Sequence, residues 1–127
     1  MARTAITNEE HEVILQEIIE GLNKLKKIKG WAVVSQEGLV IEQQMPKDIN
    51  PHLLAGNAAA LAHSAQVVSS QTGAGSLNTL ILDSEKYKVV LVGGNFKIIL
   101  LVIAEHSSDL QSLAGFLEAS ANRFQAD

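Results

Sequence analysis

Apolar residues near the start of the chain recur every three or four positions, which predicts an amphipathic helix. Thr7 and Glu10 in "TNEE" can form a capping box at its beginning. Its apolar stripe consists of Ile14, Leu15, Ile18, Ile19, Leu22 and Leu25. Four lysines crowd the far end of the helix, at positions 24, 26, 27 and 29. We expect these lysines to form a solvated helix end that complements the helix dipole. The alternative is that they form a docking patch for an acidic partner.

The pattern then changes to two short apolar runs around a polar break, in "IKGWAVVSQEGLVI". It predicts a β-hairpin with strands at 31–35 and 39–43 and a turn at 36–38. Gly38 supplies the positive φ that a short turn needs. Trp31, the only tryptophan, is expected at the rim of the core, with a contact anchor as the alternative.

A long alanine-rich helix is predicted next, with Asn50 as its N-cap, Pro51 in its first position and Gly73 at its end. Its apolar residues fall on two sides of the helix. One face consists of Leu54, Ala58, Leu61, Ala65 and Val68, and a smaller face nearly opposite consists of Leu53, Ala60 and Val67. A helix that is apolar on two sides is covered on two sides. We expect the sheet to cover the first face and another element or a partner subunit to cover the second.

Three further strands are predicted at 77–83, 87–92 and 96–104. The turns between them, "SEK" and "GGN", are short enough only for antiparallel neighbours. The last strand, "FKIILLVIA", is apolar almost throughout, which is typical of a central strand covered on both faces. We therefore expect helices on both sides of the sheet.

A third helix closes the pattern, with Ser107 or Ser108 as its N-cap and Asp109 in its first turn. Its stripe consists of Leu110, Leu113, Ala114, Leu117, Ala121 and Phe124. Phe116 falls off this stripe and is expected to border the core, with an interaction anchor as the alternative. By length, residues 1–127 are expected to form one domain.

Composition narrows the classes of function. Ten Lys and Arg against fourteen Asp and Glu give a net charge of −4, which argues against a dedicated nucleic-acid binder. The absence of cysteine excludes disulfides and thiolate metal sites, and it fits a cytoplasmic protein. No signal peptide and no bilayer-spanning segment are visible, so we expect no direct membrane insertion.

No catalytic constellation is recognisable in the sequence. The four histidines are scattered, and His52 and His63 lie roughly 16 Å apart along the second helix, too far to share a metal. The pieces "GAGS" and "GGN" lack the Lys and Ser/Thr that follow a phosphate-binding loop. We therefore expect no enzyme activity, no cofactor and no metal.

The order helix, hairpin, helix, three-strand meander, helix resembles the Roadblock/dynein light chain family over nearly the whole chain. The resemblance rests on "IKGWAVVSQEGLVI", with Gly30 and Gly38 at the family's glycine positions, on "LLAGNAAALAHSAQVVSSQTG" and on the glycine-bounded meander. It implies an α+β fold of profilin- and longin-like type, with a five-stranded antiparallel sheet in the order 2-1-5-4-3. The first and third helices would lie on one face and the second helix on the other.

The resemblance also implies a dimer in which the third strand pairs with its counterpart and the second helices pack together. The residues support this independently. The second strand carries Glu42, Gln43 and Gln44 and is followed by Pro46, which discourages pairing at that edge, whereas "LNTLILD" is unguarded until Asp83. The expected dimer interface comprises Leu53, Ala60, Val67, Asn78, Thr79, Leu80, Ile81 and Leu82. A homodimer is the commonest arrangement, and a heterodimer with a related chain stays open.

Family members serve as accessory subunits of dynein motors, as scaffolds for Ras-like GTPases and as regulators. The resemblance implies a stand-alone prokaryotic-type member that binds a small Ras-like GTPase across the two second helices. The expected contacts are His52, Gly56, Ala59 and His63. Neither Arg3 nor Arg123 is a convincing catalytic finger, so any stimulated hydrolysis would come from repositioning the GTPase's own residues.

Two alternatives to a binding module stay open. A small-molecule sensor of profilin-like architecture needs a cavity lined by convergent polar groups, and the predicted core is aliphatic. An enzyme is the third possibility. The sequence does not identify the GTPase, nor whether it is activated, inhibited or tethered.

Overall fold

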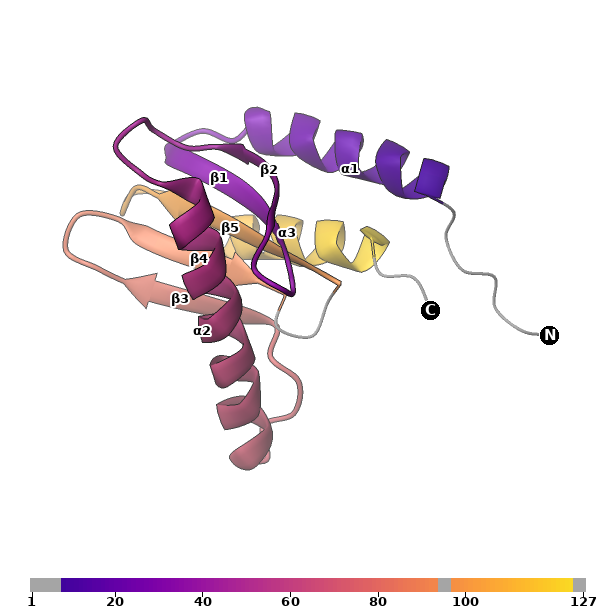
Figure 1. Ribbon diagram of the computed structural model, residues 1–127. Coiled ribbons are helices and arrows are strands. Elements are labelled where there is room, and N and C mark those ends of the chain that lie inside the picture. Colours follow the sequence, from indigo (N-terminus) through magenta and orange to yellow (C-terminus); the bar gives the residue numbers. More distant parts are fainter. Residues whose placement is uncertain (1–7, 94–96, 125–127) are drawn as a thin grey trace.

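The computed structural model describes residues 8–93 and 97–124. Its elements are α1 (Asn8–Asn23), β1 (Ile28–Ser35), β2 (Val40–Gln44), α2 (Pro51–Gln71), β3 (Thr79–Asp83), β4 (Lys88–Val92), β5 (Ile98–Ala104) and α3 (Leu110–Phe124). The strands form a five-stranded antiparallel sheet in the order β2-β1-β5-β4-β3, which confirms the expected topology. Figure 1 shows α1 and α3 on one side of this sheet and α2 crossing the other side.

Large side chains fill the layer between the sheet and the pair formed by α1 and α3. Ile18 and Leu22 of α1 and Leu117 of α3 are at most 2% exposed and belong to one buried cluster. The two helices also approach each other closely, because a Cβ added to Gly21 would lie 2.6 Å from the Phe116 ring. Phe116 thus borders the core, as expected, and this layer is closed.

Trp31 lies in the core and not at its rim, so that prediction was wrong. Its side chain is 3% exposed, and its indole N–H donates a hydrogen bond to Asn23 Oδ1 at 3.1 Å. The last residue of α1 therefore supplies the acceptor that a buried indole needs.

The layer beneath α2 is built from small side chains. The buried residues of α2 are Ala55, Ala58, Ala59 and Ala62, and they pack with strands β1, β4 and β5 in a second cluster. Because the distance between packed elements depends on the side chains at the contact, alanines let this helix lie close to the sheet. The prediction that Leu61 and Val68 would face the sheet was wrong: they are 38% and 57% exposed.

The expected ends of α2 are confirmed. Asn50 Oδ1 accepts hydrogen bonds from the backbone N–H groups of His52 and Leu53 at 3.0 and 3.3 Å, and Pro51 follows in the first helical position. Beyond the other end, Gly73 adopts a φ of 76°, a left-handed conformation in which glycine has no steric penalty.

The N-cap of α3 is Asp109, not Ser107 or Ser108. Its carboxylate accepts hydrogen bonds from the hydroxyl and the backbone N–H of Ser112, at 2.8 and 3.2 Å. These two hydrogen bonds hold the pKa of Asp109 below its usual value, and the bond from the hydroxyl has the larger effect. The hydroxyl of Ser108 is engaged elsewhere, since it donates to the carbonyl of Lys27 at 2.9 Å.

Several strands differ from their predicted bounds. β1 begins at Ile28, before the predicted 31, because its first residues pair with the end of β5. β3 begins at Thr79, after the predicted 77, because the N–H of Leu77 donates to Gln66 Oε1 of α2 at 2.7 Å and is held outside the ladder. Thr7 of the capping box and residues 94–96 of the last predicted hairpin and strand lie outside the described residues.

Candidate functional site

The exposed surface of α2 is uncharged. This helix of 21 residues contains no Asp, Glu, Lys or Arg. Four of its large apolar side chains are exposed, namely Leu53 (68%), Leu61 (38%), Val67 (40%) and Val68 (57%). A helix that faces only water normally carries charged residues on its outer side, so this surface is of the kind that another protein covers.

One flank of α2 borders an apolar groove. The groove has a volume of about 180 Å³ and lies between α2, strands β3 and β4, and the middle of β5. Its lining residues are Leu54, Asn57, Ala58, Leu61, Leu82, Val89, Leu91 and Leu101. The groove therefore joins the exposed side of α2 to strand β3 in one apolar surface.

Strand β3 is an edge strand with an open backbone. Within the described residues it pairs with β4 alone. The N–H of Ser84 donates to the carbonyl of Tyr87 at 3.2 Å, and hydrogen-bonded pairs alternate along an antiparallel ladder. Leu82 and Leu80 therefore bond to β4, whereas Ile81 turns its N–H and carbonyl to the free edge. An open apolar edge of this kind is a template for another strand.

The residues expected at the dimer interface fall into separate groups. Leu53, Ala60 and Val67 lie on the exposed outer side of α2. On β3, Leu80 packs with the α2 layer and Leu82 lines the groove. Alternation along the strand puts Thr79 and Ile81 on the opposite face. Thr79 is tied there to α3, since its hydroxyl donates to Glu118 Oε2 at 2.6 Å. Asn78 precedes the strand.

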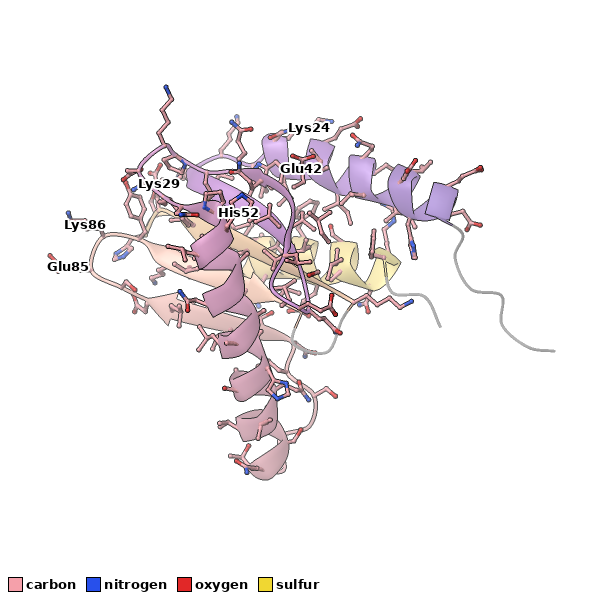
Figure 2. The ribbon with its side chains drawn as sticks, in the orientation of Figure 1. Lys24, Lys29, Glu42, His52, Glu85 and Lys86 are labelled. Atoms are coloured by element: carbon pink, nitrogen blue, oxygen red, sulfur yellow. The ribbon has the colours of Figure 1, made fainter. Side chains whose placement is uncertain are left out.

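The other flank of α2 faces the β1–β2 hairpin and is more polar. Gly38 forms the turn with a φ of 90°, as predicted, and a Cβ added to it would lie 3.1 Å from the Gly56 Cα. A pocket of about 260 Å³ lies beside this contact. Its lining residues are Gln36, Ala59, Ala62, His63, Gly93 and Ile99. His52, exposed in the first turn of α2, is labelled in Figure 2.

Ala59 does not belong to the outer surface where it was expected. It is 8% exposed and packs in the cluster between α2 and the sheet, in a turn of helix that also abuts the hairpin. Its side chain therefore contributes to the fold and to the floor of the pocket, whereas His52, Gly56 and His63 are exposed.

Gly56 has no evident role within the chain. A Cβ added at this position would meet no atom within 4 Å, and its φ is not in the left-handed region. A glycine inside a helix costs about 1 kcal/mol relative to alanine. Alanine occupies most neighbouring positions, so the missing methyl group at Gly56 is not explained by packing inside this chain.

The described part of the chain shows no arrangement suited to metal binding or to crossing a membrane. In residues 8–93 and 97–124, no group of three His, Asp or Glu side chains could hold a metal ion. Over the same ranges, none of the helices combines the length and hydropathy that a membrane span requires.

Sequence reasoning missed the exposure of Leu61 and Val68 and the contributions of Gln36 and Gly93 to the pocket. The signal for the first was present, because alanines recur at helical spacing from position 55 to position 62. They form the stripe that suits close contact with a sheet. For the pocket there was no signal, because three segments distant in sequence meet there.

Comparison with known proteins identifies the family. The family model of the Roadblock/LC7 domain matches residues 14–104. A protein of Methanocaldococcus jannaschii, described as uncharacterized protein MJ0310, is 26% identical over 113 residues, which cover 89% of this chain and 98% of that protein.

Solved structures share the fold. MglB of Myxococcus xanthus matches with a TM-score of 0.75 and 16% identity, over 94% of this chain and 90% of that one. A Roadblock/LC7 domain from Streptomyces avermitilis matches with a TM-score of 0.72 and 15% identity, over 84% and 90% of the two chains. MglB in a tetrameric arrangement also matches, with a TM-score of 0.72 and 15% identity, over 97% and 96% of the two chains. By the family-model match and this shared fold, the chain belongs to the Roadblock/LC7 domain family.

Proposed function

We propose that this protein is a non-enzymatic binding module, a homodimer that binds and regulates a small Ras-like GTPase in the cytoplasm. The observation that carries the proposal is the uncharged, partly apolar surface of α2 beside the open edge of β3, in a chain of the Roadblock/LC7 family. The family resemblance implies that these two elements are used for assembly.

The dimer in this proposal forms by antiparallel pairing of β3 with β3 of a second copy. The outward N–H and carbonyl of Ile81 supply backbone bonds, and the groove at Leu61 and Leu82 receives apolar side chains of the second α2. The tetrameric arrangement of the similar MglB supports assembly between copies. A heterodimer with a related chain would use the same surface.

The GTPase in this proposal docks on the flank of α2 that faces the hairpin, at His52, Gly56 and His63. Ala59 supports this flank from beneath. Gly56 is the strongest of these assignments, because the absent methyl group would let a partner's backbone come close to the helix.

Catalytic assistance by an arginine of this chain does not form part of the proposal. Arg123 bonds to Glu17 of α1 at 2.8 Å, in the layer on the opposite side of the sheet from α2. Arg3 lies outside the described residues. If GTP hydrolysis is stimulated, the effect comes from repositioning groups of the GTPase itself.

The test combines the purified protein with each Ras-like GTPase encoded in the same genome. Binding is measured by calorimetry with the GTPase loaded with GDP or with a non-hydrolysable GTP analogue. We expect one GTPase to bind, with different affinities for the two nucleotide states. The absence of binding by every GTPase in both states would contradict the proposal. Stabilisation by a metabolite with no GTPase binding would favour a sensor instead.

A further inference from the structure

The positive charge of this acidic chain is concentrated at one end of the sheet. The ends of three strands meet there, because the first residue of β1 and the first residue of β4 both pair with Ala104 at the end of β5. The lysines of this end are Lys24, Lys26, Lys27, Lys29, Lys47, Lys86 and Lys88. Figure 2 shows Lys24, Lys29 and Lys86 around it. The only other described cations are Lys97 and Arg123.

Acidic residues are fewer at this end than lysines. They are Glu20, which lies one helical turn before Lys24, and Asp48, Asp83, Glu85, Glu105 and Asp109. Asp48 lies 4.0 Å from Lys29, whose ammonium also lies 4.9 Å from the centre of the Tyr87 ring. Asp109 caps α3 and keeps its negative charge at the α3 side of the pocket described next, where it offsets part of the charge of the lysines. Among the described residues, Lys24, Lys26 and Lys27 form no ion pair, so their charges are available to a partner.

A pocket opens beside these lysines, between the α1–β1 loop and α3. It has a volume of about 220 Å³. Its lining residues are Leu25, Lys26, Lys27, Ile28, Ser108, Asp109, Ser112, Leu113 and Phe116. The pocket therefore combines apolar side chains of the α1–β1 segment and of α3 with two exposed lysines.

Lys27 occupies a backbone position that would suit glycine. Its φ is 61°, the one left-handed conformation of a non-glycine residue in the described part of the chain. The loop is fixed there because the Lys27 carbonyl accepts bonds from the Ser108 hydroxyl and the Glu105 N–H, each at 2.9 Å. A bulky residue in this region costs of order 1 kcal/mol. The backbone does not need a lysine, which points to a use for its side chain.

We propose that this pocket binds an acidic peptide segment of a partner protein. One apolar side chain of the segment enters between Leu25 and Phe116, and its carboxylates lie against Lys24, Lys26 and Lys27. A peptide fits better than an anionic bilayer, because a concave pocket with an apolar lining needs a side chain that enters it. This surface lies apart from α2 and β3, so it does not depend on the proposed GTPase and dimer sites.

The test uses a fluorescein-labelled peptide with a central phenylalanine and two glutamates on each side, and fluorescence anisotropy as the readout. We expect saturable binding that weakens at least fivefold when the phenylalanine is replaced by alanine. Replacement of the glutamates by lysines should abolish binding. Addition of about 500 mM NaCl should weaken binding at least fivefold, because salt screens the attraction between the carboxylates of the peptide and the lysines.

Matched variants locate the peptide on the protein. The double variant Lys26→Ala, Lys27→Gly should bind at least tenfold more weakly and stay folded, because glycine suits the φ of position 27. The control Lys47→Ala, Lys86→Ala removes two lysines of the same end that do not line the pocket, and should bind within twofold of the wild type. Equal losses in both variants, or no binding of the peptide at all, would overturn the proposal. So would binding to phosphatidylserine vesicles in place of the peptide.

Discussion

The two faces of the sheet are covered in different ways. On one face, α1 and α3 interlock over large side chains such as Ile18, Leu22 and Leu117, and the layer is closed. On the other face, α2 lies on alanines and leaves its own leucines and valines exposed. The first arrangement stabilises the monomer, whereas the second gives up buried area and leaves an apolar surface exposed, of the kind that partners cover.

The largest effect on stability is expected from the closed layer. Leu117→Ala removes a fully buried side chain and should lower the free energy of unfolding by about 3 kcal/mol. Leu53→Ala, at a position of α2 that is exposed in the single chain, should change the free energy of unfolding of the monomer by less than about 0.5 kcal/mol. Urea denaturation of both variants, at protein concentrations low enough to dissociate a dimer, measures the contrast. Similar losses in the two variants under these conditions would mean that α2 is covered within the chain.

The edge of β3 can be tested without damage to the sheet. Ile81→Pro removes an N–H that points away from β4, so the protein should stay folded and become a monomer. Leu82→Pro removes an N–H that bonds to β4 and should unfold the protein. Leu80→Lys should give a monomer or an unstable protein, because Leu80 also packs under α2. Light scattering with chromatography measures the mass. A normal dimer of Ile81→Pro would exclude pairing through this edge.

Gly56 allows stability and binding to be separated. Gly56→Ala should raise the free energy of unfolding by about 1 kcal/mol, because alanine favours the helix and its Cβ meets no atom within 4 Å. The same variant should weaken GTPase binding about tenfold. Gly115→Ala in α3 is the matched control, since Gly115 is equally open. It should stabilise the protein and leave binding unchanged, and an equal loss of binding in both variants would argue against a contact at Gly56.

The smallest effect concerns the cap of α3. The pKa of Asp109 is lowered in the folded protein, so its ionised form contributes stability above the unfolded pKa, about 4. This contribution is lost as the pH falls through the folded pKa. Asp109→Ala should therefore lower the melting temperature slightly at about pH 7, and by less at about pH 3. Asp109→Asn keeps a capping oxygen and should show little change of its own with pH. A constant difference for Asp109→Ala over this range would mean that the carboxylate charge is not what stabilises the helix.

Local signals predicted most of the fold. Asn50 and Gly73 mark the ends of α2, Gly38 marks the hairpin turn, and the apolar run of β5 indicated a central strand with helices on both faces. The order of the strands in the sheet came from the family resemblance. Short connections identify the two strands of one hairpin as neighbours, but they do not show how separate hairpins are arranged in the sheet. The candidate site was predicted in outline, with α2 and β3 as its elements.

What the sequence by itself determined is where elements begin, turn and end, because capping and turn preferences act over a few residues. Only the tertiary structure decided which side of α2 meets the sheet, that Ala59 is buried, and that Asp109 caps α3 while Ser108 bonds to Lys27. The first two outcomes and the bond from Ser108 to Lys27 depend on contacts between residues far apart in the chain, whereas the cap bonds between Asp109 and Ser112 are local. Helical periodicity alone allows more than one apolar stripe to be the buried one.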